Sequence, residues 1–359
     1  MKLTRLALVA LAVFGSAALL PQPAAAQSPK KHILVIGESV RRQSWSAYGY
    51  ARPTTPYLDA MKSDLVLLQA AMADANLTSW SVPMILTGMT PEHFALSDVR
   101  GNLVDLAKEG GYSTVWLVNQ DLNMSRSVGI DPDRFEFAPD PKSNIFGRGA
   151  LDGSLLPSYL REIKRSGRAR FVGIHMMGSH WEYFRRYPPS FQRFGSGGTL
   201  QSLSVGSLFL TDSQTSAALV DAYDNSILYT DWFLKQLIDG ASALTIPATL
   251  MFFPDHGEDL QQLDGSKLHG LPVYTRHAFE IPAFVWVNQA FRKAHPDMVA
   301  ALQANAVKEI RSHDVFYTEA QLMGITWPGS DGRRSFSSSQ FVPDSAMMFA
   351  AGGTLVKRR

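Results

Sequence analysis

The chain has 359 residues, 45% of them hydrophobic and 18% charged, which is the balance of a globular protein of enzyme size. Its 34 Lys and Arg residues nearly offset its 32 Asp and Glu residues, so no strongly cationic surface and no nucleic-acid partner is expected. The sequence contains no cysteine, which excludes disulfides and thiolate chemistry. Any metal would bind through His, Asp, Glu or hydroxyl groups, and these ligands favour zinc or a harder divalent ion.

Residues 1–26 have the pattern of a secretory signal peptide. Lys2 and Arg5 form a basic start, the apolar run Leu6–Leu20 is short for a membrane span, and small residues follow it. We therefore predict cleavage at the end of this segment and a single globular domain over residues 27–359, in the periplasm of a Gram-negative host. An uncleaved membrane anchor is the alternative. Because no later apolar run could cross a bilayer, a soluble monomer is expected.

Strand-like apolar runs alternate with helix-like stretches along the rest of the chain. Strands are expected at His32–Gly37, Ser113–Val118, Arg170–His175, Ala248–Phe253 and Ala283–Val287. Helices are expected at Leu103–Glu109, Leu155–Ser166, Ser216–Ile238 and Pro296–Arg311. This alternation predicts an α/β fold with helices on both faces of a sheet. A Gly- and Ser-rich stretch, Pro188–Thr211, is predicted to be a surface loop, and Phe336–Arg359 a mobile tail.

Metal-binding residue types follow two of these strands. Asp255 and His256 come just after Ala248–Phe253, and Glu38 comes just after His32–Gly37. Ligands of open α/β sheets bind at the carboxyl ends of the strands, and an adjacent Asp and His can both reach one divalent ion from such a turn. The alternatives are a dipeptide without function and, for Glu38, a residue that caps the next helix.

Three more residues add to this group. Thr78 lies in a hydroxyl-rich stretch before a helix-like segment, where a hydroxyl can receive a phosphoryl group if a bound metal activates it. An ordinary helix N-cap is the alternative for Thr78. His180 follows the strand Arg170–His175, and His269 follows the Asp–His pair after a short polar loop. A lone histidine is more often structural, but several donors at three strand ends favour a site.

Several motifs, in order along residues 32–330, resemble the catalytic domain of bacterial phosphoethanolamine transferases, which belong to the alkaline phosphatase and sulfatase superfamily. They are Gly37–Ser39, Tyr48–Pro56, Thr78–Pro83, Gly178–His180, Tyr223–Asp231, Asp255–Glu258, His269–Pro272 and Ser312–Asp314. The resemblance implies an alkaline phosphatase-like fold, a three-layer α/β/α sandwich with a mostly parallel central sheet.

The resemblance also implies a zinc site and a reaction. Glu38, Thr78, Asp255 and His256 would hold one catalytic zinc ion, with a second metal left open. Thr78 would be the nucleophile that takes phosphoethanolamine from phosphatidylethanolamine. The acceptor would be lipid A, another lipopolysaccharide sugar or another periplasmic glycan.

Further roles follow from the same resemblance. His180 and His269 would contact the transferred phosphate or a second metal, and Asn119 would contact substrate. The alternative functions are a periplasmic phosphodiesterase or phosphatase that uses water as acceptor, and a binding protein that keeps the fold without catalysis.

The sequence departs from the family in two respects that affect function. Familiar members carry a bundle of membrane helices, so we expect peripheral membrane contact here through apolar loops such as Trp181–Tyr187 or Leu208–Leu210, unless these loops are packed inside. The family also brackets its nucleophile loop with a disulfide. Asp74 and Met84 occupy those places, and packing is expected to hold the loop instead.

Overall fold

A seven-stranded sheet runs through the middle of this computed structural model, in the order β2–β10–β7–β1–β6–β4–β5. Its strands are β1 (Lys31–Gly37), β2 (Leu65–Leu68), β4 (Ser113–Val118), β5 (Arg134–Phe137), β6 (Arg170–His175), β7 (Ala248–Pro254) and β10 (Ala283–Val287). All neighbouring pairs are parallel except those of β10 with β7 and β2. The structure describes residues 28–95, 97, 99, 101–120, 129–138, 150–195, 213–260, 267–344 and 347–358, so the predicted signal peptide lies outside the described residues.

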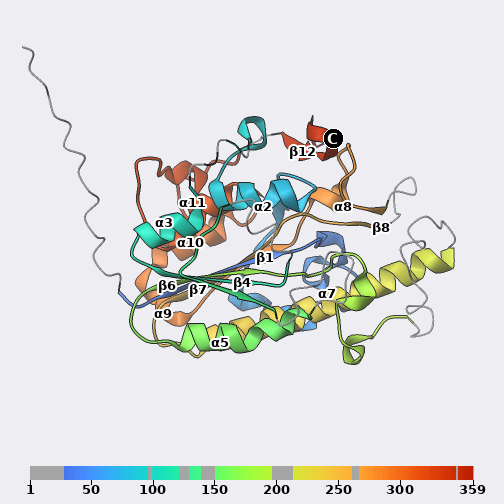
Figure 1. Cartoon of the computed structure of the whole chain (residues 1–359), viewed down its shortest axis with the longest axis horizontal. Helices are drawn as coiled ribbons and strands as arrows, with labels where there is room; N and C mark the ends of the chain where they lie inside the picture. Colours follow the sequence, from blue (N-terminus) through green and yellow to red (C-terminus); the bar gives the residue numbers. More distant parts are fainter. Residues whose placement is uncertain are drawn as a thin grey trace, which may run out of the picture.

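Helices cover both faces of this sheet, which confirms the predicted three-layer sandwich (Figure 1). One face carries α2 (Thr78–Thr87), α3 (Leu103–Glu109), α10 (Pro296–Asn305) and α11 (Asp314–Leu322), and the other carries α5 (Leu156–Lys164) and α7 (Ser213–Ser242). The alternation of β1 shows how the layers form: Leu34 and Ile36 pack into one core and Ile33 and Val35 into the other. Burial on both faces explains why the central strands read as continuous apolar runs.

Smaller elements complete the fold. They are α1 (Pro56–Ala60), α8 (Arg276–Phe279), α9 (Gln289–Ala294) and the two-stranded pairs β3 (Ala70–Met72) with β11 (Glu309–Arg311), β8 (Asp259–Leu260) with β9 (Lys267–Leu268), and β12 (Met348–Ala350) with β13 (Thr354–Val356). None of the helices in the described ranges combines the length and the hydropathy that a membrane crossing requires.

Two predicted segments are wrong. The helix expected over Pro296–Arg311 ends at Asn305, because Glu309–Arg311 leaves the helix and pairs in parallel with β3. The predicted mobile tail is packed: Phe336 and Phe341 lie in the core beside α10 and α11, and the chain then forms the β12–β13 hairpin. Both errors have one cause, since pairing and burial against distant segments leave no local periodicity in the sequence.

The expected membrane loops have two different outcomes. In Trp181–Tyr187, the side chains of Trp181 and Tyr183 are buried in the core against α7, so the packed alternative holds for them. Leu208–Leu210 lies outside the described residues. Within Pro188–Thr211, a short 3₁₀ turn (η8) spans Pro189–Phe191, and the part from residue 196 onward is not described.

A buried ionic network holds the segment that leads to Thr78, so packing is not the only constraint on the nucleophile loop. Asp74 Oδ1 accepts a hydrogen bond from Arg311 Nε at 2.8 Å, and Asp74 Oδ2 accepts from His313 Nδ1 at 2.7 Å. Burial opposes the charge of Asp74, but His313 and Arg311 outweigh it and lower the pKa of Asp74 to about 2. The loop is therefore tied by charge to β11 and the start of α11, across more than two hundred residues of sequence.

We expect Asp74→Ala to lower the free energy of unfolding by about 3–5 kcal/mol, because it removes the buried carboxylate that accepts from both Arg311 Nε and His313 Nδ1. Urea denaturation at pH 7 measures the change. The control is Asp239→Ala, which removes an exposed pair with Lys235 and should cost less than about 1 kcal/mol. Equal effects of the two substitutions would contradict the structural role of the network.

A second buried carboxyl makes stability depend on pH. Glu319 of α11 is fully buried, neither of its oxygens has a hydrogen-bond partner among the described residues, and burial raises its pKa to about 8. Its pKa in the unfolded chain is about 4.3. A raised folded pKa gives stability that is complete below the unfolded pKa and is lost as pH rises through the folded pKa.

The free energy of unfolding should therefore fall between about pH 5 and pH 8 more steeply in the wild type than in Glu319→Gln, by up to about 1.4 kcal/mol per pH unit. Urea denaturation of both proteins across this range tests the difference. Parallel pH profiles would show that Glu319 is not neutral in the folded protein.

Candidate metal centre

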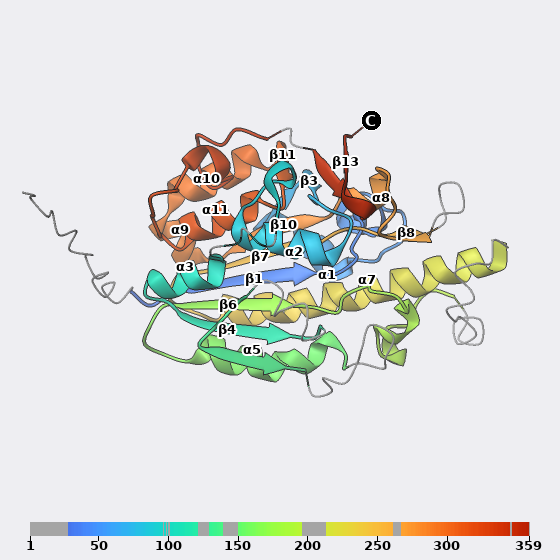
Figure 2. The same cartoon turned by 45° about the horizontal axis from the view of Figure 1, so that its top comes forward.

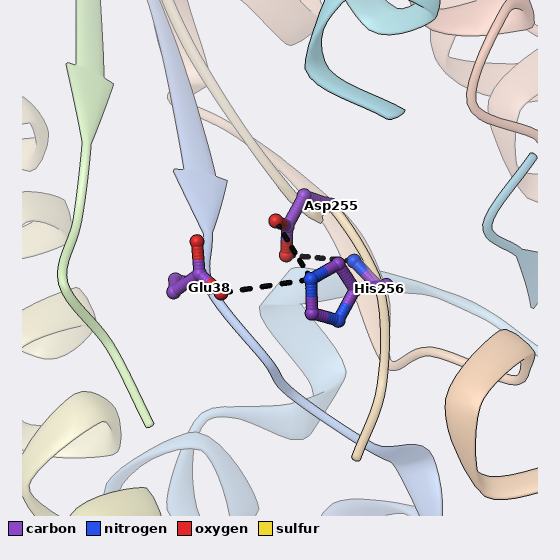
Figure 3. A group of neighbouring side chains, drawn as sticks. All are labelled: Glu38, Asp255 and His256. Atoms are coloured by element: carbon purple, nitrogen blue, oxygen red, sulfur yellow. Dashed lines mark hydrogen bonds and ion pairs between the residues drawn. The ribbon is translucent and has the colours of Figure 1, made fainter. Parts of the chain in front are cut away.

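The ends of two neighbouring parallel strands bring the predicted metal ligands together (Figure 3). Gly37 of β1 is in register with Pro254 of β7, so the next residues, Glu38 and Asp255, meet at the same edge of the sheet. The backbone N–H of Asp255 donates to the carbonyl of Gly37 at 2.9 Å, which fixes this approach. His256 follows directly on the same turn.

The three side chains form one buried group. His256 Nε2 lies 3.3 Å from Asp255 Oδ2 and 3.7 Å from Glu38 Oε1, and one ligand atom from each residue lies within 4.8 Å of the others. Thr78 Oγ1 lies 3.2 Å from both Glu38 Oε2 and His256 Nε2. The structure thus places all four predicted ligands around one point.

The hydrogen bonds of this group test whether it fits a cation. His256 Nδ1 lies 2.8 Å from the carbonyl oxygen of Gly257, which can only accept, so Nδ1 carries the proton and the lone pair is on Nε2. Asp255 Oδ1 accepts from the N–H groups of Ser39 and His256, but the buried Oδ2 has no hydrogen-bond donor among the described residues. Two carboxylates and an imidazole lone pair facing one another fit a divalent metal cofactor.

The pKa directions have the same cause. Burial, then the neighbouring Asp255, raises the pKa of Glu38 well above its usual range, and burial raises the pKa of Asp255. Burial lowers the pKa of His256 well below its usual range. Each shift expresses the cost of concentrating negative charge and lone pairs in a dry site, and a bound cation reverses this cost.

Thr78 is the first residue of α2, so its hydroxyl lies at the positive end of a helix dipole. The alternative prediction, an N-cap, is wrong because the N-cap is Leu77, which makes no side-chain capping bond. The N–H of Trp80 donates to the carbonyl of Leu77 at 3.1 Å, but the apolar side chain of Leu77 cannot cap the N–H groups of Thr78 and Ser79, which can bind an anion.

His180 and His269 lie beside the metal group. The ring of His269 is centred 4.2 Å from that of His256 and 5.9 Å from that of His180. Burial opposes the charge of His269, but Glu258 Oε2, 3.3 Å from its Nδ1, outweighs burial and raises the pKa. His180 Nδ1 donates to the carbonyl of Trp181, and burial, then His269, lowers the pKa of His180 to about 3. The two histidines therefore have opposite tendencies to carry charge.

The loop that carries His180 is fixed tightly against Glu38. Gly178 has φ +49°, and a Cβ there would lie 2.7 Å from the carbonyl oxygen of Glu38. The buried Asp152 accepts from the N–H of Gly178 at 2.9 Å, and Arg186 Nε donates to the carbonyl of His180 at 2.8 Å. A glycine is required here because both the conformation and the close approach exclude a side chain.

The hydrogen bonds of the Asn119 side chain go to residues other than the four predicted metal ligands. Its Nδ2 donates to Asp152 Oδ1 and to the carbonyl of Ala150, both at 2.8 Å, so its donors serve the loop, and substrate contact by Asn119 stays a prediction. The sequence analysis missed its neighbour Gln120, whose Nε2 donates to Glu38 Oε2 at 3.0 Å. The sequence feature that could have predicted this contact is the position of Gln120, a polar residue just beyond the end of β4.

Removal of one ligand charge gives a test of the metal site. In metal-free protein, Glu38→Gln should keep or raise the melting temperature, because it relieves repulsion between two buried carboxylates. Added Zn²⁺ should raise the melting temperature of the wild type by several degrees, as expected for a ligand that binds only the folded state, and should leave the variant nearly unchanged.

Thermal unfolding with EDTA or with excess Zn²⁺ measures both effects. Glu109→Gln, at an exposed position of α3, is the matched control and should keep the wild-type response. A full Zn²⁺ shift in Glu38→Gln would rule out Glu38 as a ligand.

Comparisons with known proteins agree with this geometry and confirm the predicted resemblance. The chain is 26% identical over 323 residues to phosphoethanolamine transferase EptC of Escherichia coli O18:K1:H7 (strain RS218 / NMEC). The aligned part covers 87% of this chain and 54% of the relative. The chain therefore spans about half the length of the curated relatives it matches. The crystal structure of the C-terminal periplasmic domain of Escherichia coli EptC matches with a TM-score of 0.75 at 25% identity, over 91% of this chain and 90% of that chain. The same domain in complex with Zn matches with a TM-score of 0.77 at 23% identity, over 93% and 96%. The model of the Sulfatase family matches residues 30–325, and the chain therefore belongs to the sulfatase family.

Proposed function

We propose that this chain is a zinc-dependent phosphoethanolamine transferase. It would move phosphoethanolamine from phosphatidylethanolamine to a glycan, with a phosphoethanolamine ester of Thr78 as the intermediate. The acceptor would be lipid A, another lipopolysaccharide sugar or another periplasmic glycan. The observation that carries this proposal is the position of the Thr78 hydroxyl, 3.2 Å from Glu38 and from His256 at the N-terminus of α2. The similarity to phosphoethanolamine transferases EptC and CptA supports the choice of transferred group.

Zinc would be held by Glu38, Asp255, His256 and the hydroxyl of Thr78. The oxygen and nitrogen donors suit this ion, and the EptC domain crystallised in complex with Zn supports the choice. When bound, zinc supplies positive charge that favours the ionised hydroxyl of Thr78 and offsets negative charge on the phosphoryl oxygens. Gln120 keeps Glu38 oriented, because its amide donates to the Oε2 that also faces Thr78.

In the first transfer, Thr78 Oγ1, whose proton has passed to water, forms a bond to phosphorus while the bond from phosphorus to the diacylglycerol oxygen breaks. His269, favoured in its protonated form by Glu258, donates a proton to the leaving oxygen, and diacylglycerol departs. The N–H groups at the start of α2 stabilise the charge that spreads over the phosphoryl oxygens. The products are diacylglycerol and a phosphoethanolamine ester of Thr78.

In the second transfer, an acceptor hydroxyl attacks the same phosphorus from the side that diacylglycerol left. His269, now neutral, takes the hydroxyl proton, and Thr78 Oγ1 is the leaving group, which restores both residues. His180 is neutral, and its proton is on Nδ1, so Nε2 presents a lone pair. A lone pair can bind a second metal ion but cannot donate a hydrogen bond to a phosphate oxygen.

Export through a signal peptide at residues 1–26, one catalytic domain over residues 27–359 and a periplasmic, monomeric enzyme belong to the same proposal. The match to the periplasmic domain of EptC supports the location. A glycolipid acceptor and a phospholipid donor would both be available there, at membrane surfaces.

Incubation of the purified protein with phosphatidylethanolamine should add one phosphoethanolamine group to Thr78, as measured by intact-protein and peptide mass spectrometry. Thr78→Ala should show no adduct and a loss of transfer of at least about 10³-fold, because it removes the hydroxyl that lies 3.2 Å from both Glu38 and His256, whereas the nearby Ser39 Oγ is bonded to Glu38 Oε1. Ser79→Ala, which removes the next hydroxyl of the same helix, is the matched control and should keep the adduct.

Three outcomes separate the candidate functions. A modified glycan supports the transferase, whereas release of free phosphoethanolamine without a modified glycan identifies a phosphodiesterase that uses water. Full activity of Thr78→Ala would overturn both.

A further inference from the structure

The β12–β13 hairpin is attached by its backbone to the segment that leads to Thr78. Phe349 and Ala75 form a bridge, the N–H of Phe349 donates to the carbonyl of Asp74 at 2.7 Å, and the N–H of Asn76 donates to the carbonyl of Phe349 at 3.2 Å. Figures 1 and 2 show the hairpin, in red, beside α2 on the same side of the molecule. What the hairpin presents to its surroundings is therefore presented next to Thr78.

The hairpin has one face buried in a core and one face that is partly exposed. Met348 and Ala350 lie in a small core with Phe279, and Val356 packs against it. Because side chains alternate along a strand, Phe349 and its cross-strand partner Leu355 lie on the opposite face. This face is apolar as well, although no second core in the described part of the chain includes either residue.

The outer face of the hairpin continues onto α2. The ring of Phe349 is centred 5.4 Å from that of Trp80 and 6.1 Å from that of Phe94. Leu355 is 40% exposed, and the three aromatic rings are partly exposed. We call Trp80, Phe94, Phe349 and Leu355 the aromatic row. Trp80, one of its members, lies in the first turn of the helix that begins with Thr78.

We propose that the aromatic row is a membrane-docking surface that inserts into the interfacial region of a lipid bilayer and brings Thr78 to the headgroups. Aromatic side chains favour the boundary between headgroups and acyl chains. Beyond β13 the chain continues with exposed Lys357, a cation that suits the phosphate layer above this boundary, and with Arg358, which pairs with Glu280 and Glu309.

The chemistry of the donor explains why a bilayer is the occupant. This step rests on the proposed function. The phosphorus of a phospholipid is bonded to diacylglycerol, whose acyl chains strongly resist removal from the bilayer. Thr78 can reach that phosphorus without extracting the lipid only if its own surroundings enter the interface. Trp80 of the aromatic row shares the first turn of α2 with Thr78, and the backbone of Phe349 is bonded to Asp74 and Asn76, just before Thr78.

Co-sedimentation with phosphatidylcholine vesicles tests docking without any donor present. The wild type should bind, and Leu355→Asp should lower the vesicle partition coefficient about tenfold, because it replaces an inserted apolar group by a charge. Val307→Asp, at an apolar position that is 72% exposed and outside the row, is the matched control and should bind like the wild type. Phe94→Ser is a second variant that should also weaken binding, and circular dichroism verifies that each variant is folded.

The rate of Thr78 modification gives a second readout. The ratio of the rate with bilayer phosphatidylethanolamine to the rate with a short-chain, water-soluble analogue should fall about tenfold in Leu355→Asp and stay unchanged in Val307→Asp. Vesicle binding by Leu355→Asp equal to that of the wild type would overturn the proposal. So would a wild type that does not bind vesicles and sediments as a dimer through this face.

The two proposals can fail separately. If Thr78 is modified by neither donor while vesicle binding still depends on Leu355, docking stands and the transferase function falls. If Thr78 is modified equally well from both donors in every variant, the function stands and docking falls.

Discussion

The repulsion between two buried carboxylates is the constraint on which the rest of this structure depends. Glu38 and Asp255 are forced together because β1 and β7 are parallel neighbours in register. No described donor reaches Asp255 Oδ2, and the Nε2 lone pair of His256 faces the same point. A bound cation offsets this repulsion, and the surroundings hold the ligands in place for it. The glycine at position 178 and the amide of Gln120 serve that purpose.

The nucleophile loop is held by long-range contacts of a different kind. Asp74 is bound by Arg311 and His313, and the backbone of the next residues pairs with the β12–β13 hairpin. The chain has no cysteine, and these contacts add to the packing that was expected to hold the loop. Ion pairs depend on pH and on burial rather than on redox conditions, so this constraint on the loop requires the charge of Asp74.

The β12–β13 hairpin links the nucleophile loop to the protein surface. The hairpin whose backbone pairs with the loop carries Phe349 and Leu355 on its outer side, and the ring of Phe349 contacts that of Trp80. One small element therefore contributes to the rigidity of the nucleophile and to the character of the surface around it. The hairpin can contribute to both because side chains alternate along a strand, which gives a two-stranded hairpin two independent faces.

The sequence by itself determined the central strands and the candidate ligands. Ser113–Val118 and Arg170–His175 were predicted residue by residue because strands buried on both faces are continuous apolar runs, and the donors that follow them must meet at one sheet edge. Only the tertiary structure decided the β11 strand, the packed C-terminal segment, the partnership of Glu258 with His269 and the role of Gln120. These depend on which distant segments become neighbours, and a residue paired across the fold leaves no pattern in its own stretch of sequence.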